Sequence, residues 1–184
     1  MLDRHRVLLM FDEVPTGLGR TGHLFAAAAT GIAPDLSVVG KSLGGAILPF
    51  AALIGRADLN VAGELGIGHV THEKSALGCW VALELLQVLD DDGLLARADP
   101  IGASITRSLP PDAVDAAGHH GALVAIRLID AAAARTASLV ERSYAAGLNA
   151  TGGNGRIALS MPLITTDDEA AAVAGILTQA LCAA

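Results

Sequence analysis

The chain has 184 residues, 52% of them hydrophobic, and a formal net charge of -7 at pH 7. This apolar content can fill the core of one ordinary domain or of two small lobes, and it excludes a disordered tail. The basic residues are scattered through the sequence. That scatter argues against nucleic acid or an anionic membrane as the main partner, because both bind clustered Lys and Arg.

No apolar run approaches the length of a membrane span, and residues 1–6 are too highly charged for a signal peptide. We therefore expect a cytoplasmic protein. Cys79 and Cys182 lie in apolar surroundings of helical character. In such surroundings we expect small buried hydrophobic side chains and no disulfide.

The first half of the chain predicts strands separated by glycine-rich segments. Apolar runs at residues 7–11, 36–39 and 50–54 have the length of strands. The uninterrupted first run is typical of a parallel strand covered on both faces. Residues 23–30 predict a short helix that ends at Gly31.

The second half predicts longer helices that alternate with strands. The last helix has the pattern of a capping box, with Thr166 at its start and Glu169 three residues later. Helices are expected over residues 75–90, 94–109, 131–146 and 166–182, and strands over 123–129 and 156–160. The alternation predicts an α/β fold with two parts, residues 1–90 and 91–184.

Two glycine motifs resemble nucleotide-binding loops, but neither has the required context. Residues 17–22 match G-x-G-x-x-G, yet five residues separate them from the preceding strand. Residues 40–42 imitate the end of a P-loop, but Asp35 stands where its first glycine is needed. His69 and His72 have helical spacing without a third clustered ligand, so we expect surface histidines and no metal.

Asp12 and Lys41 are the polar residues that point to chemistry, since each follows a predicted parallel strand. Open α/β sheets bind their ligands at the carboxyl ends of such strands. A lysine among glycines and apolar neighbours can be desolvated and made nucleophilic toward an aldehyde, and a carboxylate can keep a heteroaromatic nitrogen protonated. Pyridoxal phosphate requires both groups. The alternative is a loop acid and an exposed lysine without catalytic roles.

Three stretches carry a resemblance to a known family: FDEV…TGLGRTG at 11–22, GIAPD at 31–35 and GKSLGG…LP at 40–49. They resemble the class III pyridoxal-phosphate aminotransferases of fold type I, a group that includes ornithine and 4-aminobutyrate aminotransferases. The resemblance implies the C-terminal part of a large cofactor-binding domain with mainly parallel strands, followed by a small α/β domain.

The resemblance also implies roles for individual residues. Asp12 matches the acid that pairs with the pyridine nitrogen, Val14 the residue that packs on the ring, and Lys41 the Schiff-base lysine. Thr71 matches a threonine that reaches the cofactor phosphate of the neighbouring subunit. The resemblance therefore implies a dimer with a shared active site and a small amine or amino acid as substrate.

Two positions depart from the family pattern. Pro15 stands where most members have Gln, and Ala158 stands where many have the Arg that binds the substrate carboxylate. Arg156 lies two residues away on the same strand face, where it either replaces that Arg or is a charge facing solvent. The substrate is therefore expected to differ from a standard α-amino acid, and the sequence is similar to a subgroup that includes lyases.

The family's phosphate loop and stacking aromatic lie upstream of the segment that this chain resembles, and none of its five aromatic residues is placed to replace that stack. Half of a sheet would also expose unpaired edges and apolar faces. We expect either the C-terminal half-subunit of an aminotransferase, which an N-terminal half polypeptide completes, or a fragment of a longer chain. In either case it should be inactive alone. The alternatives are an ammonia-lyase with the same cofactor and a non-catalytic interaction subunit.

Overall fold

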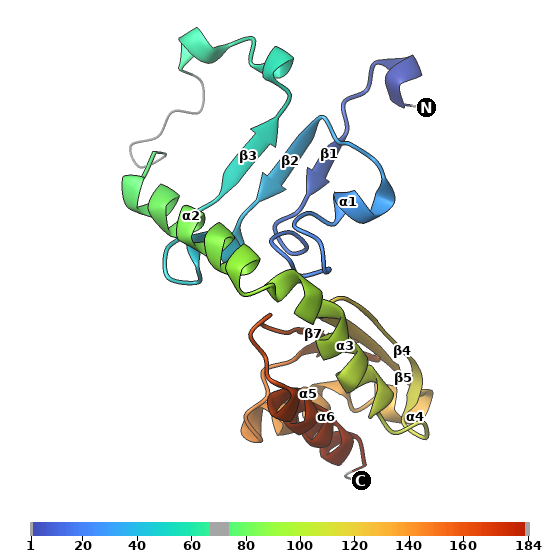
Figure 1. The fold of residues 1–184 in the computed structure, drawn as a ribbon. Helices are drawn as coiled ribbons and strands as arrows, with labels where there is room; N and C mark the ends of the chain where they lie inside the picture. The colour runs from blue at the N-terminus through green and yellow to red at the C-terminus, as the bar shows by residue number, and fades with distance from the viewer. Residues whose placement is uncertain (1, 67–73, 183–184) are drawn as a thin grey trace. The chain divides into compact units, whose positions relative to one another are not determined.

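The computed structural model describes residues 2–66 and 74–182. The chain divides into two compact units (Figure 1). The first contains residues 1–19 and 23–93, and the second contains residues 20–22 and 94–184. The loop after the first strand therefore contributes three of its residues to the second unit.

The first unit is built on a three-stranded sheet of β1 (Met10–Asp12), β2 (Leu36–Val39) and β3 (Ala52–Gly55), in that order (Figure 1). Strands β1 and β2 are parallel, and β2 and β3 are antiparallel. The sheet is therefore mixed, whereas the sequence predicted mainly parallel strands. The reason is the link between β2 and β3, which holds a 3-10 turn (Lys41–Gly44) instead of a crossover helix.

Among residues 2–66 and 74–93, this unit has the α-helices α1 (Ala27–Thr30) and α2 (Ala76–Asp91). Helix α1 is shorter than predicted, because the residues before Ala27 form turns. Single 3-10 turns lie at Leu2–His5, Ala57–Leu59 and Gly63–Leu65. The N-terminus of α2 is capped by Ser75, whose side chain accepts a hydrogen bond from the Gly78 N–H at 3.1 Å.

Helix α2 packs against the loop that follows β2. A Cβ at Gly78 would lie 2.5 Å from the Phe50 ring, so this position requires glycine. The helix is only partly covered, since its apolar residues Leu77 and Val88 are 54% and 44% exposed. Cys79 on this helix is also exposed, as is Cys182 in the second unit, so both expectations of burial were wrong.

The second unit has a wholly antiparallel sheet of order β4-β5-β7-β6. Its strands are β4 (Val114–His120), β5 (Leu123–Leu128), β6 (Thr151–Gly153) and β7 (Arg156–Ser160). Strands β4 and β6 were not predicted, because VDAAGHH and TGG are poor in the β-branched and aromatic residues that mark strands.

Helices cover one face of this sheet: α3 (Ala98–Arg107), α4 (Asp130–Ala133), α5 (Thr136–Ala145) and α6 (Asp167–Cys182). A 3-10 turn at Leu94–Arg97 precedes α3, and α4 and α5 replace the single helix predicted there. The core on this face contains Val124, Ile126, Leu128, Ile157 and Leu159. The alternate residues of β5 and β7 face the open side.

The predicted capping box of α6 is present. The Glu169 N–H donates to Thr166 Oγ1 at 3.2 Å, and the Thr166 N–H donates to Glu169 Oε2 at 2.8 Å. The Thr166 N–H first, and then the Thr166 hydroxyl, which donates to the same carboxylate oxygen at 3.1 Å, hold the pKa of Glu169 below its usual value.

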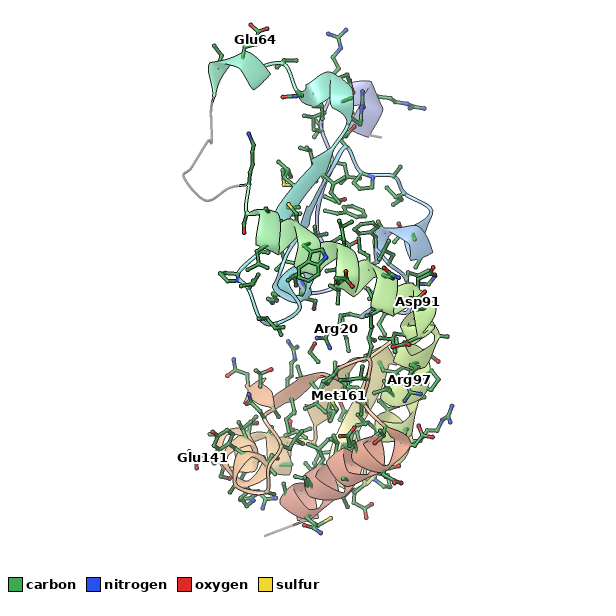
Figure 2. All side chains as sticks on the ribbon, turned by 60° about the vertical axis from the view of Figure 1, so that its left-hand side comes forward. Arg20, Glu64, Asp91, Arg97, Glu141 and Met161 are labelled. Atoms are coloured by element: carbon green, nitrogen blue, oxygen red, sulfur yellow. The ribbon has the colours of Figure 1, made fainter. Side chains whose placement is uncertain are left out.

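Residues 20–22 are joined to the second sheet by main-chain contacts. The Ala122 N–H donates to the Arg20 carbonyl at 2.8 Å, and the Arg20 guanidinium donates to the Met161 carbonyl. The guanidinium of Arg97 donates to the carbonyls of Leu163 and Thr165, a few residues after Met161. Figure 2 shows Arg20, Arg97 and Met161 close together. Burial lowers the pKa of Arg20.

In residues 2–66 and 74–182, no helix is both long and apolar enough to cross a membrane.

Candidate functional site

Asp12 and Lys41 lie at the same end of the first sheet, where the parallel strands β1 and β2 have their carboxyl ends. Asp12 ends β1 opposite Val38 of the parallel strand β2, and Lys41 follows two residues after β2 ends. The exposed Asp12 carboxylate accepts the Val14 N–H through Oδ1 at 3.0 Å. Its other oxygen has no partner within residues 2–66 and 74–182.

Lys41 has an uncommon backbone conformation, with φ of 46° in the left-handed region. Non-glycine residues adopt this region at an energetic cost and gather there at functional sites. Its side chain is exposed and makes no hydrogen bond or ion pair in the part of the chain that the structure describes. The amine is therefore available to a ligand.

Val14 connects the two groups. A Cβ on Gly40, directly before Lys41, would lie 3.6 Å from Val14 Cγ2 and 3.4 Å from Ala51 Cβ. The Val14 side chain therefore packs over the backbone that leads into Lys41. The structure brings Asp12, Val14 and Lys41 to one edge of the sheet.

Glu13 is a buried residue that the sequence analysis did not single out. Its side chain accepts the Ala27 N–H at 2.8 Å and the Thr16 hydroxyl at 2.5 Å, and the residue is only 3% exposed. Its backbone N–H donates to the Val38 carbonyl at 2.8 Å, which extends the β1–β2 ladder beyond Asp12. Glu13 thus anchors the turn after β1 to the start of α1.

Gly17 is explained by the same anchor. A Cβ at Gly17 would lie 2.9 Å from the Glu13 carbonyl oxygen. This glycine of the G-x-G-x-x-G pattern therefore permits close approach to Glu13. The sequence contains a signal for this turn: Glu13 is followed three residues later by Thr16 and then by Gly17.

The opposite end of the sheet contains an ion pair that fixes the strands. Asp35 accepts the Leu9 N–H at 2.8 Å and pairs with Arg56 at 2.6 Å. The Leu9 N–H first, and then Arg56, hold the pKa of Asp35 below its usual value. Asp35, in the GIAPD stretch, therefore has a structural explanation.

The other predicted site residues are not brought to this edge. Thr71, like His69 and His72, lies outside the described residues. Arg156 is on β7 of the second unit, where its exposed side chain has no partner among the described residues. Ala158 faces the open side of the same strand. Pro15 is exposed in the turn after Val14.

The chain matches the family model described as aminotransferase class III over residues 1–181. It belongs to the class III aminotransferases. Members of this family depend on pyridoxal phosphate. The family assignment made from the sequence is confirmed.

Curated relatives differ in activity. The chain is 33% identical to a mitochondrial ornithine aminotransferase of Rattus norvegicus over 170 residues, which cover 90% of the chain and 39% of that protein. It is 38% identical to an (R)-1-hydroxy-2-aminoethylphosphonate ammonia-lyase of Vibrio splendidus over 107 residues, or 58% of the chain and 22% of that protein. The chain therefore spans less than half the length of these relatives.

Solved structures agree on the fold. A Plasmodium falciparum ornithine δ-aminotransferase superimposes with a TM-score of 0.87 and 26% identity, covering 98% of this chain and 48% of that one. A thermostable 6-fold mutant of an ω-transaminase from Pseudomonas jessenii has the same TM-score at 24% identity, and the match covers 98% of this chain and 44% of that one. The predicted α/β fold of type I is confirmed.

Proposed function

We propose that this chain is the C-terminal part of a pyridoxal-phosphate aminotransferase, which transfers an amino group from a small amine to a keto or aldehyde acceptor. Residues 1–90 would belong to the cofactor-binding domain and residues 91–184 to the small domain. The observation that carries the proposal is the placement of Asp12, Val14 and Lys41 at the carboxyl ends of two adjacent parallel strands.

The available groups fit the cofactor. The free oxygen of Asp12 suits the protonated pyridine nitrogen, the Lys41 amine suits the aldehyde, and Val14 offers an apolar surface to the ring. When bound, pyridoxal phosphate supplies an aldehyde that condenses with amines and a ring that withdraws electrons from the attached carbon. Thr71 is the residue proposed to reach the phosphate of the neighbouring subunit.

Each residue then has a defined task. Asp12 keeps a proton on the pyridine nitrogen, since its carboxylate favours the charged ring. With the cofactor bound, the Lys41 amine would be the group that holds its aldehyde. The same Nζ atom would serve as the general base and acid that moves a proton at the substrate carbon. The left-handed backbone conformation at Lys41 limits the directions in which its side chain can leave the main chain.

The first unit also has surfaces suited to an N-terminal half polypeptide. Strands β1 and β3 form the two edges of its sheet. Large apolar side chains on or beside these strands are exposed: Val7 50%, Leu8 53%, Met10 55%, Leu53 63% and Ile54 48%. Edges and apolar patches of this kind favour further strands from a partner. We propose that this partner supplies the phosphate loop and the ring stack, and that two such assemblies form a dimer.

A second candidate reaction is elimination of ammonia. It is favoured by Ala158, which removes the carboxylate-binding Arg expected of many aminotransferases, and by the similarity to the ammonia-lyase of Vibrio splendidus. Product analysis separates the two reactions. Transamination requires a keto or aldehyde acceptor, whereas elimination releases ammonia without one.

The proposal is tested by cofactor binding to the chain, alone and with any polypeptide that co-purifies with it. Borohydride trapping followed by peptide mapping should place the cofactor on Lys41, and Lys41→Ala should abolish the visible absorbance. Lys74→Ala is the matched control, because Lys41 and Lys74 are the chain's two lysines. Cofactor absorbance that survives Lys41→Ala, or none in either preparation, contradicts the proposal. Cofactor binding without turnover of any amine favours a non-catalytic subunit.

A further inference from the structure

Glu13 lies between two residues of the candidate site, Asp12 and Val14, and each of its own polar groups forms a hydrogen bond. Its backbone N–H donates to the Val38 carbonyl at 2.8 Å, and its backbone carbonyl accepts the Gly17 N–H at 2.9 Å. Its two carboxylate oxygens accept one bond each, from the start of α1 and from the turn. A residue that is 3% exposed and paired at every polar group has little freedom to rotate.

The bond that orients Asp12 depends on the backbone of Glu13. Asp12 Oδ1 accepts the Val14 N–H at 3.0 Å, which is a side-chain turn that closes over the residue between them. Because peptide bonds are planar, few rotations set the geometry of such a turn, and φ and ψ of the middle residue are among them. While Glu13 is held, the Asp12 carboxylate keeps one oxygen on the main chain and leaves the other available.

The side chain of Glu13 links the turn to two places. Helix α1 has no side-chain cap at Ala26, and the Glu13 carboxylate accepts the N–H of the first helical residue, Ala27, from 14 residues away in the chain. The Thr16 hydroxyl donates to the second carboxylate oxygen. The carboxylate therefore ties the start of the turn both to its middle and to the helix.

We propose that Glu13 is a positioning residue for the reaction proposed above. It keeps the Asp12 carboxylate on the Val14 N–H, so that the other Asp12 oxygen stays available to the pyridine nitrogen, and it keeps Val14 against the backbone before Lys41. Glu13 acts through these neighbours and does not touch the cofactor. Its part in the reaction rests on the proposed function, whereas the orientation of Asp12 can be measured without cofactor.

The test is an NMR titration of the full chain without cofactor, in Glu13→Ala and Glu13→Gln. The Val14 amide shift is followed across the range in which aspartates titrate, about pH 3–5, because a bonded N–H senses the charge of its acceptor. Neither variant has a carboxyl at position 13, so the shift reports Asp12, and adding Asp12→Asn should abolish it. Glutamine retains an acceptor for the Ala27 N–H. The pH-dependent shift should therefore persist in Glu13→Gln and be at least about twofold smaller in Glu13→Ala.

The amplitude is read on the signals of the folded state, so a general loss of stability does not change it. If Glu13→Ala does not fold, Thr16→Val and Thr16→Ser replace the pair. Both keep Glu13, and only Thr16→Val removes the hydroxyl, so its amplitude should be the smaller one. Equal amplitudes in the pair that is measured overturn the proposal.

The titration and the cofactor test of Lys41 fail independently. Equal amplitudes can occur while Lys41 still binds pyridoxal phosphate, which removes the positioning role and leaves the proposed function. Conversely, unequal amplitudes without a cofactor signal from Lys41 overturn the proposed function and leave Glu13 as a structural residue that orients Asp12.

Discussion

Glu13→Ala should destabilise the first unit strongly, although Glu13 is not proposed to touch the cofactor. The substitution removes the acceptor of the Ala27 N–H and of the Thr16 hydroxyl in a position that is 3% exposed. A hydrogen bond to a charged group contributes about 1.5–3 kcal/mol, so the loss of both predicts a decrease of roughly 3–6 kcal/mol in the free energy of unfolding.

Glu13→Gln is the matched control. The amide oxygen can still accept the Ala27 N–H, and the amide nitrogen can donate to the Thr16 hydroxyl oxygen. The expected loss is therefore smaller, about 1 kcal/mol, from replacing charged by neutral hydrogen bonds.

Urea unfolding followed by Trp80 fluorescence measures both variants. Trp80 is the single tryptophan and lies on α2 of the first unit, so its signal reports this unit. Comparison requires equal m-values. The reasoning is refuted if Glu13→Ala costs less than about 1 kcal/mol, or if Glu13→Gln costs as much as Glu13→Ala.

Further predictions concern pH and two helical glycines. The pKa of Asp35 is lower in the folded chain than its unfolded value, so its contribution is present above the unfolded pKa, about 3.9, and is lost as pH falls through the folded pKa. Urea midpoints below pH 4 should therefore fall less steeply in Asp35→Asn than in the parent, and equal slopes would contradict this. Gly102→Ala should destabilise the second unit, because its Cβ would lie 2.1 Å from the Gly121 carbonyl oxygen. Gly175→Ala should stabilise α6 by up to about 1 kcal/mol, because nothing lies within 4 Å of its Cβ and alanine favours helix. Thermal unfolding followed by circular dichroism compares the two, and shifts of the same sign would refute the steric explanation.

The sequence contained enough information for the family, the α/β class and the ends of the two parallel strands. Asp12 and Lys41 could be placed because each follows a short apolar run, a signal that is local in the chain. The capping box of Thr166 and Glu169 was predictable for the same reason, since its partners are three residues apart.

Tertiary structure decided the features that depend on distant partners. The direction of β3, the pairing of β4 and β6 and the open face of the second sheet follow from strand contacts that weak local propensity does not reveal. Glu13 became a buried anchor only because α1 returns to the end of β1. Spacing along the chain determines which residues end a strand or cap a helix, whereas burial and neighbours across a sheet are set by the packing of segments far apart in sequence.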